Sequence, residues 1–305
     1  MSEAQNLPPL RPPSRALARA FAGLAVAIWG LMVLGALVRA HGAGLACPDW
    51  PLCFGDFVPR FDLKVAFEWS HRVVAASIGL LYLGLAATLW RRPSTKPGMK
   101  RLLAAGAVVL AGQVLLGALT VWKLLAAWSV TSHLLTANIF LVCVCLVAVR
   151  LFEAASPSRP VAVGPRLREA VSLAMALLIV QIALGGLVAS KYAGLVCPEW
   201  PTCQDGVWFP GFEGARGLHL LHRLDAYALV MLLAGCAVAA RRIPRIGTVL
   251  FAAAILAVVQ GGVGVANVLL RLPVEVTGLH SALAAALVAI LALSTDAVWR
   301  RSGRR

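Results

Sequence analysis

The chain has 305 residues, of which 60% are apolar and 13% are charged, and its mean hydropathy is +0.83. A soluble protein carries about 25% charged residues, so this composition excludes a water-soluble globular domain and indicates a protein that lies in a bilayer. The formal net charge of +15 does not favour a nucleic-acid partner. The basic residues lie in short turns between apolar runs, where they are typical of membrane topology and lipid contact.

Eight apolar runs follow one another along the chain, and each is close to the ~20 residues needed to cross the hydrocarbon core. The first is too long for a cleavable signal peptide and no small-residue cleavage site follows it, so we expect it to be a span. The predicted fold class is therefore an all-α membrane protein with eight transmembrane helices. These are expected over about 20–40, 69–90, 102–122, 128–149, 169–190, 217–240, 246–270 and 277–299.

The basic residues predict which ends of these helices face the cytoplasm. Five segments hold 19 of the 28 Lys and Arg residues, while the rest of the chain holds nine basic and nine acidic residues. By the positive-inside rule these segments are cytoplasmic. Both termini are then inside, the connections 41–68 and 191–216 are outside, and a multi-pass protein of the cytoplasmic membrane is expected. The five segments are 1–19, 90–101, 150–169, 241–245 and 296–305.

A short cysteine loop occurs twice on the outer side, as "CPDWPLC" (47–53) and "CPEWPTC" (197–203). Thiols outside the cytoplasm tend to pair, so two local disulfides are expected, Cys47–Cys53 and Cys197–Cys203. Zinc would need more ligands than these loops supply. Each pair is either a staple that shapes its loop or a redox-active pair. The other cysteines lie in apolar runs and are expected only to pack; they are Cys143, Cys145 and Cys236.

The duplication extends beyond the cysteines. "GALVRAHGAGLACPDWPLC" (35–53) matches "GGLVASKYAGLVCPEWPTC" (185–203) without a gap, and "FEWSHR" (67–72) matches "LHLLHR" (218–223). An even number of spans in each half predicts parallel repeats related by an axis along the membrane normal. The expected parts are a cytoplasmic tail 1–19, a four-helix bundle 20–150, a linker 151–168, a second bundle 169–299 and a tail 300–305.

Four histidines occupy matching places in the two halves, each near the outer end of an even-numbered span: His71, His133, His222 and His280. An ionisable group inside a span is costly and indicates function. Two imidazoles in a four-helix bundle suit axial ligation of a haem iron; otherwise they would be hydrogen-bonded links between helices. Arg72 and Arg223 directly follow two of the histidines, and either meet haem propionates or extend to the interface.

Together these motifs resemble the haem A synthase family. The resemblance covers about residues 20 to 299. It rests on "EWSHR", "LHR", "TSHLL", "GLHSALA" and "GLACPDWPLC". The first loop departs from the family pattern, which usually has Thr-Gly where this chain has "HGAGL" with His41. His41 is expected to be a solvated loop residue, with approach to the first haem as the alternative.

The resemblance implies an enzyme that oxidises a methyl group of haem O to the formyl group of haem A for terminal oxidases. It places the substrate haem in the N-terminal half, at His71 and His133. A b-type haem in the C-terminal half, at His222 and His280, would pass electrons. It also implicates Cys47 and Cys53 in activity. Haem O synthase, oxidase assembly and membrane lipids are the implied partners, and a homo-oligomer is left open.

The two halves differ beside these ligands. Glu68 lies three positions before His71, on the same helix face, and the matching position before His222 is His219. A carboxylate near a reacting carbon can move protons or stabilise positive charge, so Glu68 is the predicted catalytic acid–base group. The alternatives are that Glu68 caps its helix and that His219 rather than His222 is the ligand.

Two other functions compete with haem oxidation. A non-catalytic di-haem electron carrier needs the four histidines and nothing else, and predicts that Glu68 is dispensable. A membrane thiol–disulfide oxidoreductase would use the loop cysteines, and would leave four intramembrane histidines without a role.

Overall fold

A computed structural model describes residues 15–156 and 162–302. Within these ranges the protein consists of helices and loops, apart from one isolated β-bridge between Cys53 and Asp56. The helices are α1 (Arg15–Ala40), α2 (Leu63–Trp90), α3 (Pro97–Trp122), α4 (Ala127–Ala155), α5 (Pro165–Ser190), a short 3₁₀ helix η1 (Ala193–Leu195), α6 (Gly214–Ala240), α7 (Ile246–Leu269) and α8 (Val274–Ser302).

All eight α-helices are long and apolar enough to cross a membrane, so the predicted all-α fold with eight spans is confirmed. Several helices are longer than their apolar runs. α2 begins at Leu63 rather than near residue 69, because the Asp62 carboxylate accepts the N–H of Val65 and caps the helix. The predicted tails and linker fall partly on residues 1–14, 157–161 and 303–305, which lie outside the described residues.

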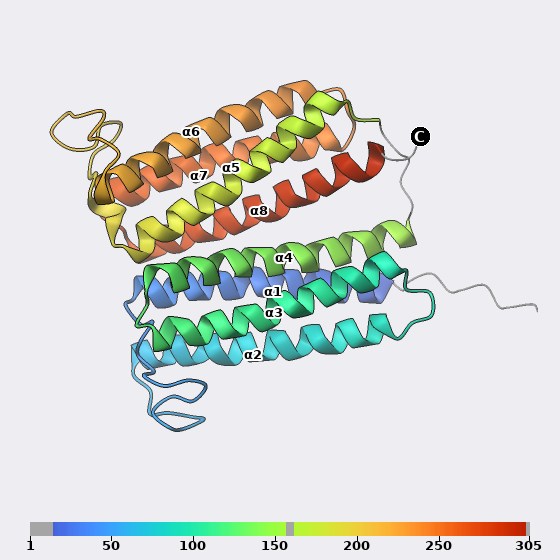
Figure 1. Cartoon of the computed structure of the whole chain (residues 1–305), viewed down its shortest axis with the longest axis horizontal. Helices are drawn as coiled ribbons and strands as arrows, with labels where there is room; N and C mark the ends of the chain where they lie inside the picture. The colour runs from blue at the N-terminus through green and yellow to red at the C-terminus, as the bar shows by residue number, and fades with distance from the viewer. Residues whose placement is uncertain (1–14, 157–161, 303–305) are drawn as a thin grey trace, which may run out of the picture.

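Helices α1 to α4 form one group and α5 to α8 a second group beside it, with all long axes roughly parallel (Figure 1). The two cysteine loops project at the same end of the molecule, and α1 begins and α8 ends at the other end (Figure 1). We call these the loop end and the terminal end. The groups meet through α1 against α8, α4 against α5 and α4 against α8. The symmetry axis and the side of the membrane that each end faces remain predictions.

Each group has its main apolar core toward the terminal end. In the first group the core includes Phe21, Tyr82 and Leu141, and in the second Leu178, Leu233 and Leu291. Their side chains are almost completely buried. This packing holds each group together away from the histidines, which lie nearer the loop end.

Ion pairs join the two groups at the terminal end. Arg150 of α4 lies 2.9 Å from Asp296 of α8, and Arg300 of α8 lies 2.7 Å from Glu153 of α4. These partners explain why α4 and α8 continue beyond their apolar runs: the charged residues pair with one another across the helix contact.

Candidate functional site

Each of the four predicted ligand histidines packs its ring against a glycine of a neighbouring helix. A methyl group built on that glycine would lie only 3.0 to 3.2 Å from the ring, so any larger residue would push the ring away. The pairs are His71 with Gly35, His133 with Gly117, His222 with Gly185 and His280 with Gly264. The repeat therefore duplicates both the imidazole and the space for it. In the sequence, this arrangement could have been recognised from the glycines that occur at equivalent positions of the two halves.

Three of these rings have a buried nitrogen with no hydrogen-bond partner. They are the Nδ1 atoms of His133, His222 and His280. A buried polar atom without a partner is costly, so these nitrogens fit a site that is completed by a ligand. Within residues 15–156 and 162–302 no group of three or more His, Cys, Asp and Glu could hold a bare metal ion. Pairs of histidines fit haem iron instead, because a porphyrin supplies the other ligands itself.

A glutamine accompanies the later histidine of each half. Gln113 Nε2 lies 3.3 Å from His133 Nε2, whereas Gln260 Nε2 donates to the backbone carbonyl of His280 at 2.9 Å. The Oε1 atoms of both glutamines are buried without a partner. The glutamine thus contacts the histidine ring in the first half and the histidine main chain in the second. The two duplicated sites therefore differ in the partner of this glutamine.

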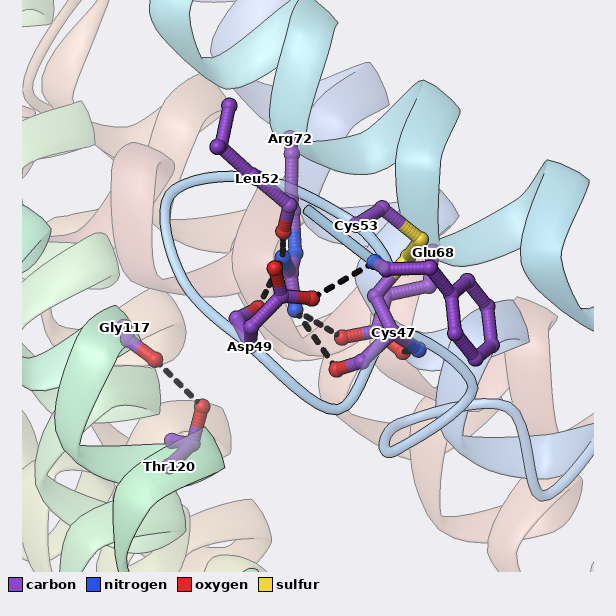
Figure 2. Close-up of polar contacts among 9 residues, drawn as sticks. Cys47, Asp49, Leu52, Cys53, Glu68, Arg72, Gly117 and Thr120 are labelled. Atoms are coloured by element: carbon purple, nitrogen blue, oxygen red, sulfur yellow. Dashed lines mark hydrogen bonds and ion pairs between the residues drawn. A yellow bond between two sulfur atoms is a disulfide. The ribbon is translucent and has the colours of Figure 1, made fainter. Parts of the chain in front are cut away.

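Glu68 and Arg72 tie α2 to the first cysteine loop (Figure 2). Glu68 is buried, with 5% of its surface exposed. Its Oε2 accepts the backbone N–H of Cys47 at 2.8 Å, and its Oε1 accepts from Arg72 Nη2 at 2.6 Å. Arg72 also donates to the carbonyls of Cys47, Asp49 and Leu52. The acid, the arginine and the disulfide loop therefore form one connected unit.

The second half has the arginine of this unit but not the carboxylate. Arg223 donates to the carbonyls of Cys197, Glu199 and Thr202 at 2.8 to 2.9 Å. His219 takes the place of Glu68, and its Nδ1 lies 3.1 Å from the carbonyl oxygen of Ala193. Both arginines thus support a loop in this structure. Their predicted contact with haem propionates stays a prediction.

These contacts decide between some of the alternatives. Asp62 caps α2, so the interpretation of Glu68 as the helix cap is wrong. His219 has a main-chain partner, whereas His222 has a buried nitrogen without one, which favours His222 as the ligand. His41 stacks on Phe67 with ring centroids 4.3 Å apart, so it packs against α2 at the end of α1.

Disulfides close both cysteine loops at the predicted pairs. The Cα atoms are 4.7 Å apart for Cys47 and Cys53, and 4.1 Å apart for Cys197 and Cys203. The remaining cysteines are half-buried or buried free thiols within helices, as expected of packing residues; they are Cys143, Cys145 and Cys236.

The acid of each loop motif organises its own loop, a role that the sequence did not reveal. The Asp49 carboxylate accepts the N–H groups of Phe54 and Gly55 at 2.7 and 2.8 Å, and these hydrogen bonds, with that of Gly55 first, lower the pKa of Asp49. In the second loop, Glu199 accepts from the Thr202 hydroxyl at 2.9 Å, which lowers the pKa of Glu199.

Comparison with known proteins gives one consistent family. The sequence profile of the COX15-CtaA family, described as cytochrome oxidase assembly protein, matches residues 18–65 and 60–292. A heme A synthase of Shewanella oneidensis is 28% identical to this chain, and the match covers 89% of this chain and 93% of the relative. A heme A synthase of Rhizorhabdus wittichii is also 28% identical, and the match covers 92% of this chain and 93% of the relative. A heme A synthase of Shouchella clausii is 32% identical to this chain, and the match covers 67% of this chain and 69% of the relative.

Proposed function

Because the chain belongs to the haem A synthase family, we propose that it is the membrane enzyme that oxidises a methyl group of haem O to the formyl group of haem A. The observation that carries the assignment of roles is an asymmetry. Two matched histidine pairs lie in equivalent glycine-lined places, and the halves differ three residues before the earlier histidine: the first half has the buried carboxylate of Glu68 there, whereas the second half has His219. The first half is therefore the substrate half.

In this proposal His71 and His133 hold the substrate haem, and Gly35 and Gly117 leave room for their rings. Glu68 lies three residues before His71, on the same helix face. Oxidation of a methyl group removes protons and electrons in successive steps, so a nearby carboxylate can accept protons or stabilise positive charge that develops at the reacting carbon. Arg72 positions Glu68 through the 2.6 Å ion pair.

The second pair, His222 and His280, would hold a resident b-type haem. Their buried Nδ1 atoms without partners and the glycines against their rings support this. Such a haem supplies electron transfer when bound. The residue that matches Glu68 is His219, which is hydrogen-bonded to Ala193, so this half has no carboxylate at that position. Its nearest acid in sequence, Asp225, follows His222 by three residues instead.

The membrane arrangement belongs to the same proposal. The loop end lies on the outer face of the cytoplasmic membrane, where both disulfides are stable, and the basic terminal end lies in the cytoplasm. Haem O arrives from the enzyme that makes it, and haem A leaves toward the assembly of terminal oxidases.

The test is to purify the protein from cells that also make haem O, and to extract and chromatograph its haems. Haem A together with unmodified b-type haem is expected, and His71→Ala should lose the haem A while it keeps the b-type haem. Only unmodified haems in the wild type, at full occupancy of both halves, would instead identify a di-haem electron carrier.

A further inference from the structure

A glutamine precedes three of the four histidine-facing glycines by four residues. The sequence reads "QVLLG" (113–117) in α3, "QIALG" (181–185) in α5 and "QGGVG" (260–264) in α7, whereas α1 has "LMVLG" (31–35). Residues four apart share one face of a helix, so each glutamine lies on the face that meets a histidine ring. The helix that faces the fourth histidine, His71, carries Leu31 at this position.

The three glutamines and their histidines carry complementary atoms without partners. In the part of the chain that the structure describes, Oε1 of each glutamine and Nδ1 of the histidine that it accompanies are buried and make no hydrogen bond. Leaving a buried acceptor and a buried ring nitrogen unpaired is costly. Three such pairs at equivalent places indicate hydrogen bonds that are completed when a ligand binds. The pairs are Gln113 with His133, Gln181 with His222 and Gln260 with His280.

Iron ligation would complete these pairs. When Nε2 of an imidazole binds iron, Nδ1 carries the proton and needs an acceptor, and an amide oxygen is one. Gln113 Nε2 already lies 3.3 Å from the ring of His133, so a rotation of its amide would present Oε1 instead. Gln181 lies at the equivalent place in α5, one turn before the glycine against which the ring of His222 packs.

The ring of His71 is turned over relative to the other three. Its Nε2 lies closest to the methyl position on the adjoining glycine, at 3.0 Å, and its Cδ2 follows at 3.5 Å. In the other three rings Cε1 is closest and Nδ1 follows, at 3.5 to 3.8 Å. A carbon atom thus takes the place of Nδ1 in the one pair where leucine takes the place of glutamine. Leu31 offers this ring no hydrogen-bond acceptor.

From this pattern we propose that Gln181 is a positioning residue that fixes His222 on the resident haem, and that Leu31 at the matching place leaves His71 able to release the substrate haem. This rests on the proposed function. A resident cofactor must stay bound through many turnovers, whereas a substrate must enter and its product must leave in each one. The hydrogen-bond partner of a ligand histidine contributes about 10- to 100-fold in affinity. The second site has two such histidines, and the first has only His133.

Exchange of the two residues tests the proposal. Purified protein with haem B in the second half and haem O in the first is mixed with excess apomyoglobin, which captures released haem. The haems that remain are chromatographed over time, and any haem A is counted with haem O. In the wild type, haem O should leave faster than haem B. Gln181→Leu should release haem B about tenfold faster or more, with haem O release unchanged. Leu31→Gln should slow the release of haem O and leave that of haem B unchanged.

Gln181→Glu is the matched control, because its carboxyl group keeps an acceptor oxygen at the same length. It should retain haem B like the wild type. The midpoint potential of the resident haem gives a second measurement. An acceptor on Nδ1 makes the imidazole a more basic ligand, which stabilises the ferric state. Gln181→Leu should therefore raise the potential and Gln181→Glu should not, a difference that a packing defect alone would not produce.

Release of haem B from Gln181→Leu at the wild-type rate would overturn the proposal, and so would an equal acceleration for both haems. Unchanged haem O release from Leu31→Gln would overturn the part that concerns His71. If Gln181→Leu does not fold, Gln181→Asn, whose amide is one methylene shorter, is measured in its place with the same expected result. A wild type that binds both haems but makes no haem A would refute the proposed function and leave the release rates measurable, because the experiment needs no turnover.

Discussion

Glu68 accepts the backbone N–H of Cys47 through Oε2 at 2.8 Å, so the buried acid beside His71 and the first disulfide loop are held by one hydrogen bond. The contact spans 21 residues of sequence. A change at either residue therefore acts on the other. The proposed catalytic role of Glu68 and the proposed involvement of Cys47 in activity are, in this structure, properties of the same unit.

Glu68→Gln should keep the fold and the C-terminal haem spectrum but make little or no haem A. The amide oxygen can still accept the Cys47 N–H, whereas the negative charge is lost. Glu68→Asp should retain part of the activity, because the charge remains but is withdrawn by one methylene. The measurement is haem A per unit of purified protein in cells that also make haem O. A wild-type yield in Glu68→Gln would refute the catalytic role.

Removal of either C-terminal ligand should abolish most of the low-spin b-type spectrum. His222→Ala and His280→Ala each take away one axial ligand of the proposed resident haem. His71→Ala is the matched control in the other half, and should leave that spectrum in place. Absorbance spectra of the purified, reduced proteins test this. If both C-terminal variants keep the full spectrum, the assignment of these ligands is wrong.

Gly35→Ala should lower the haem A yield without affecting the resident haem. The new methyl group would lie 3.0 Å from His71 Nε2, so the ring must shift away from its present position. Gly30→Ala on the same helix is the control, because nothing lies within 4 Å of the methyl group there. We expect a reduction of several-fold, corresponding to about 1 kcal/mol. Equal yields from the two variants would contradict the argument that Gly35 makes room for the ring.

Cys47→Ala should reduce activity more than Cys197→Ala. Both changes open a loop, but the loop of Cys47 is hydrogen-bonded to a buried carboxylate through the Cys47 backbone N–H, whereas the residue that matches Glu68 in the second half, His219, is hydrogen-bonded to Ala193. Mass mapping without reductant should first show the Cys47–Cys53 and Cys197–Cys203 links in the wild type. Haem A yields of the two variants then give the comparison. Equal, negligible losses would leave both disulfides with a purely structural role.

Much of the architecture could be predicted because it depends on residues that are close together in the sequence. Apolar runs of sufficient length gave the eight helices, and the duplicated spacing gave the matched histidines. The start of α2 was placed about six residues late, because an average over apolar residues does not detect a cap such as Asp62. The two cysteine pairs were predictable because each closes a loop of only a few residues.

The polar contacts of the site could not be predicted in the same way. That Arg72 donates to carbonyls of the cysteine loop depends on the path of the chain between α1 and α2, which no periodicity encodes. The role of Asp49 in its loop depends on the same path.

The contacts between the two groups also bear on how the molecule arose. α1 packs against α8, and α5, which matches α1, packs against α4, which matches α8. A first helix thus meets the last helix of the other half in both directions, which is the isologous contact of a two-fold symmetric dimer. We infer that a four-helix ancestor already paired with its own copy through this surface. After fusion of the two copies into one chain, the sequences of the two halves could diverge. One half could then carry an acid, Glu68, at the position where the other carries an imidazole, His219.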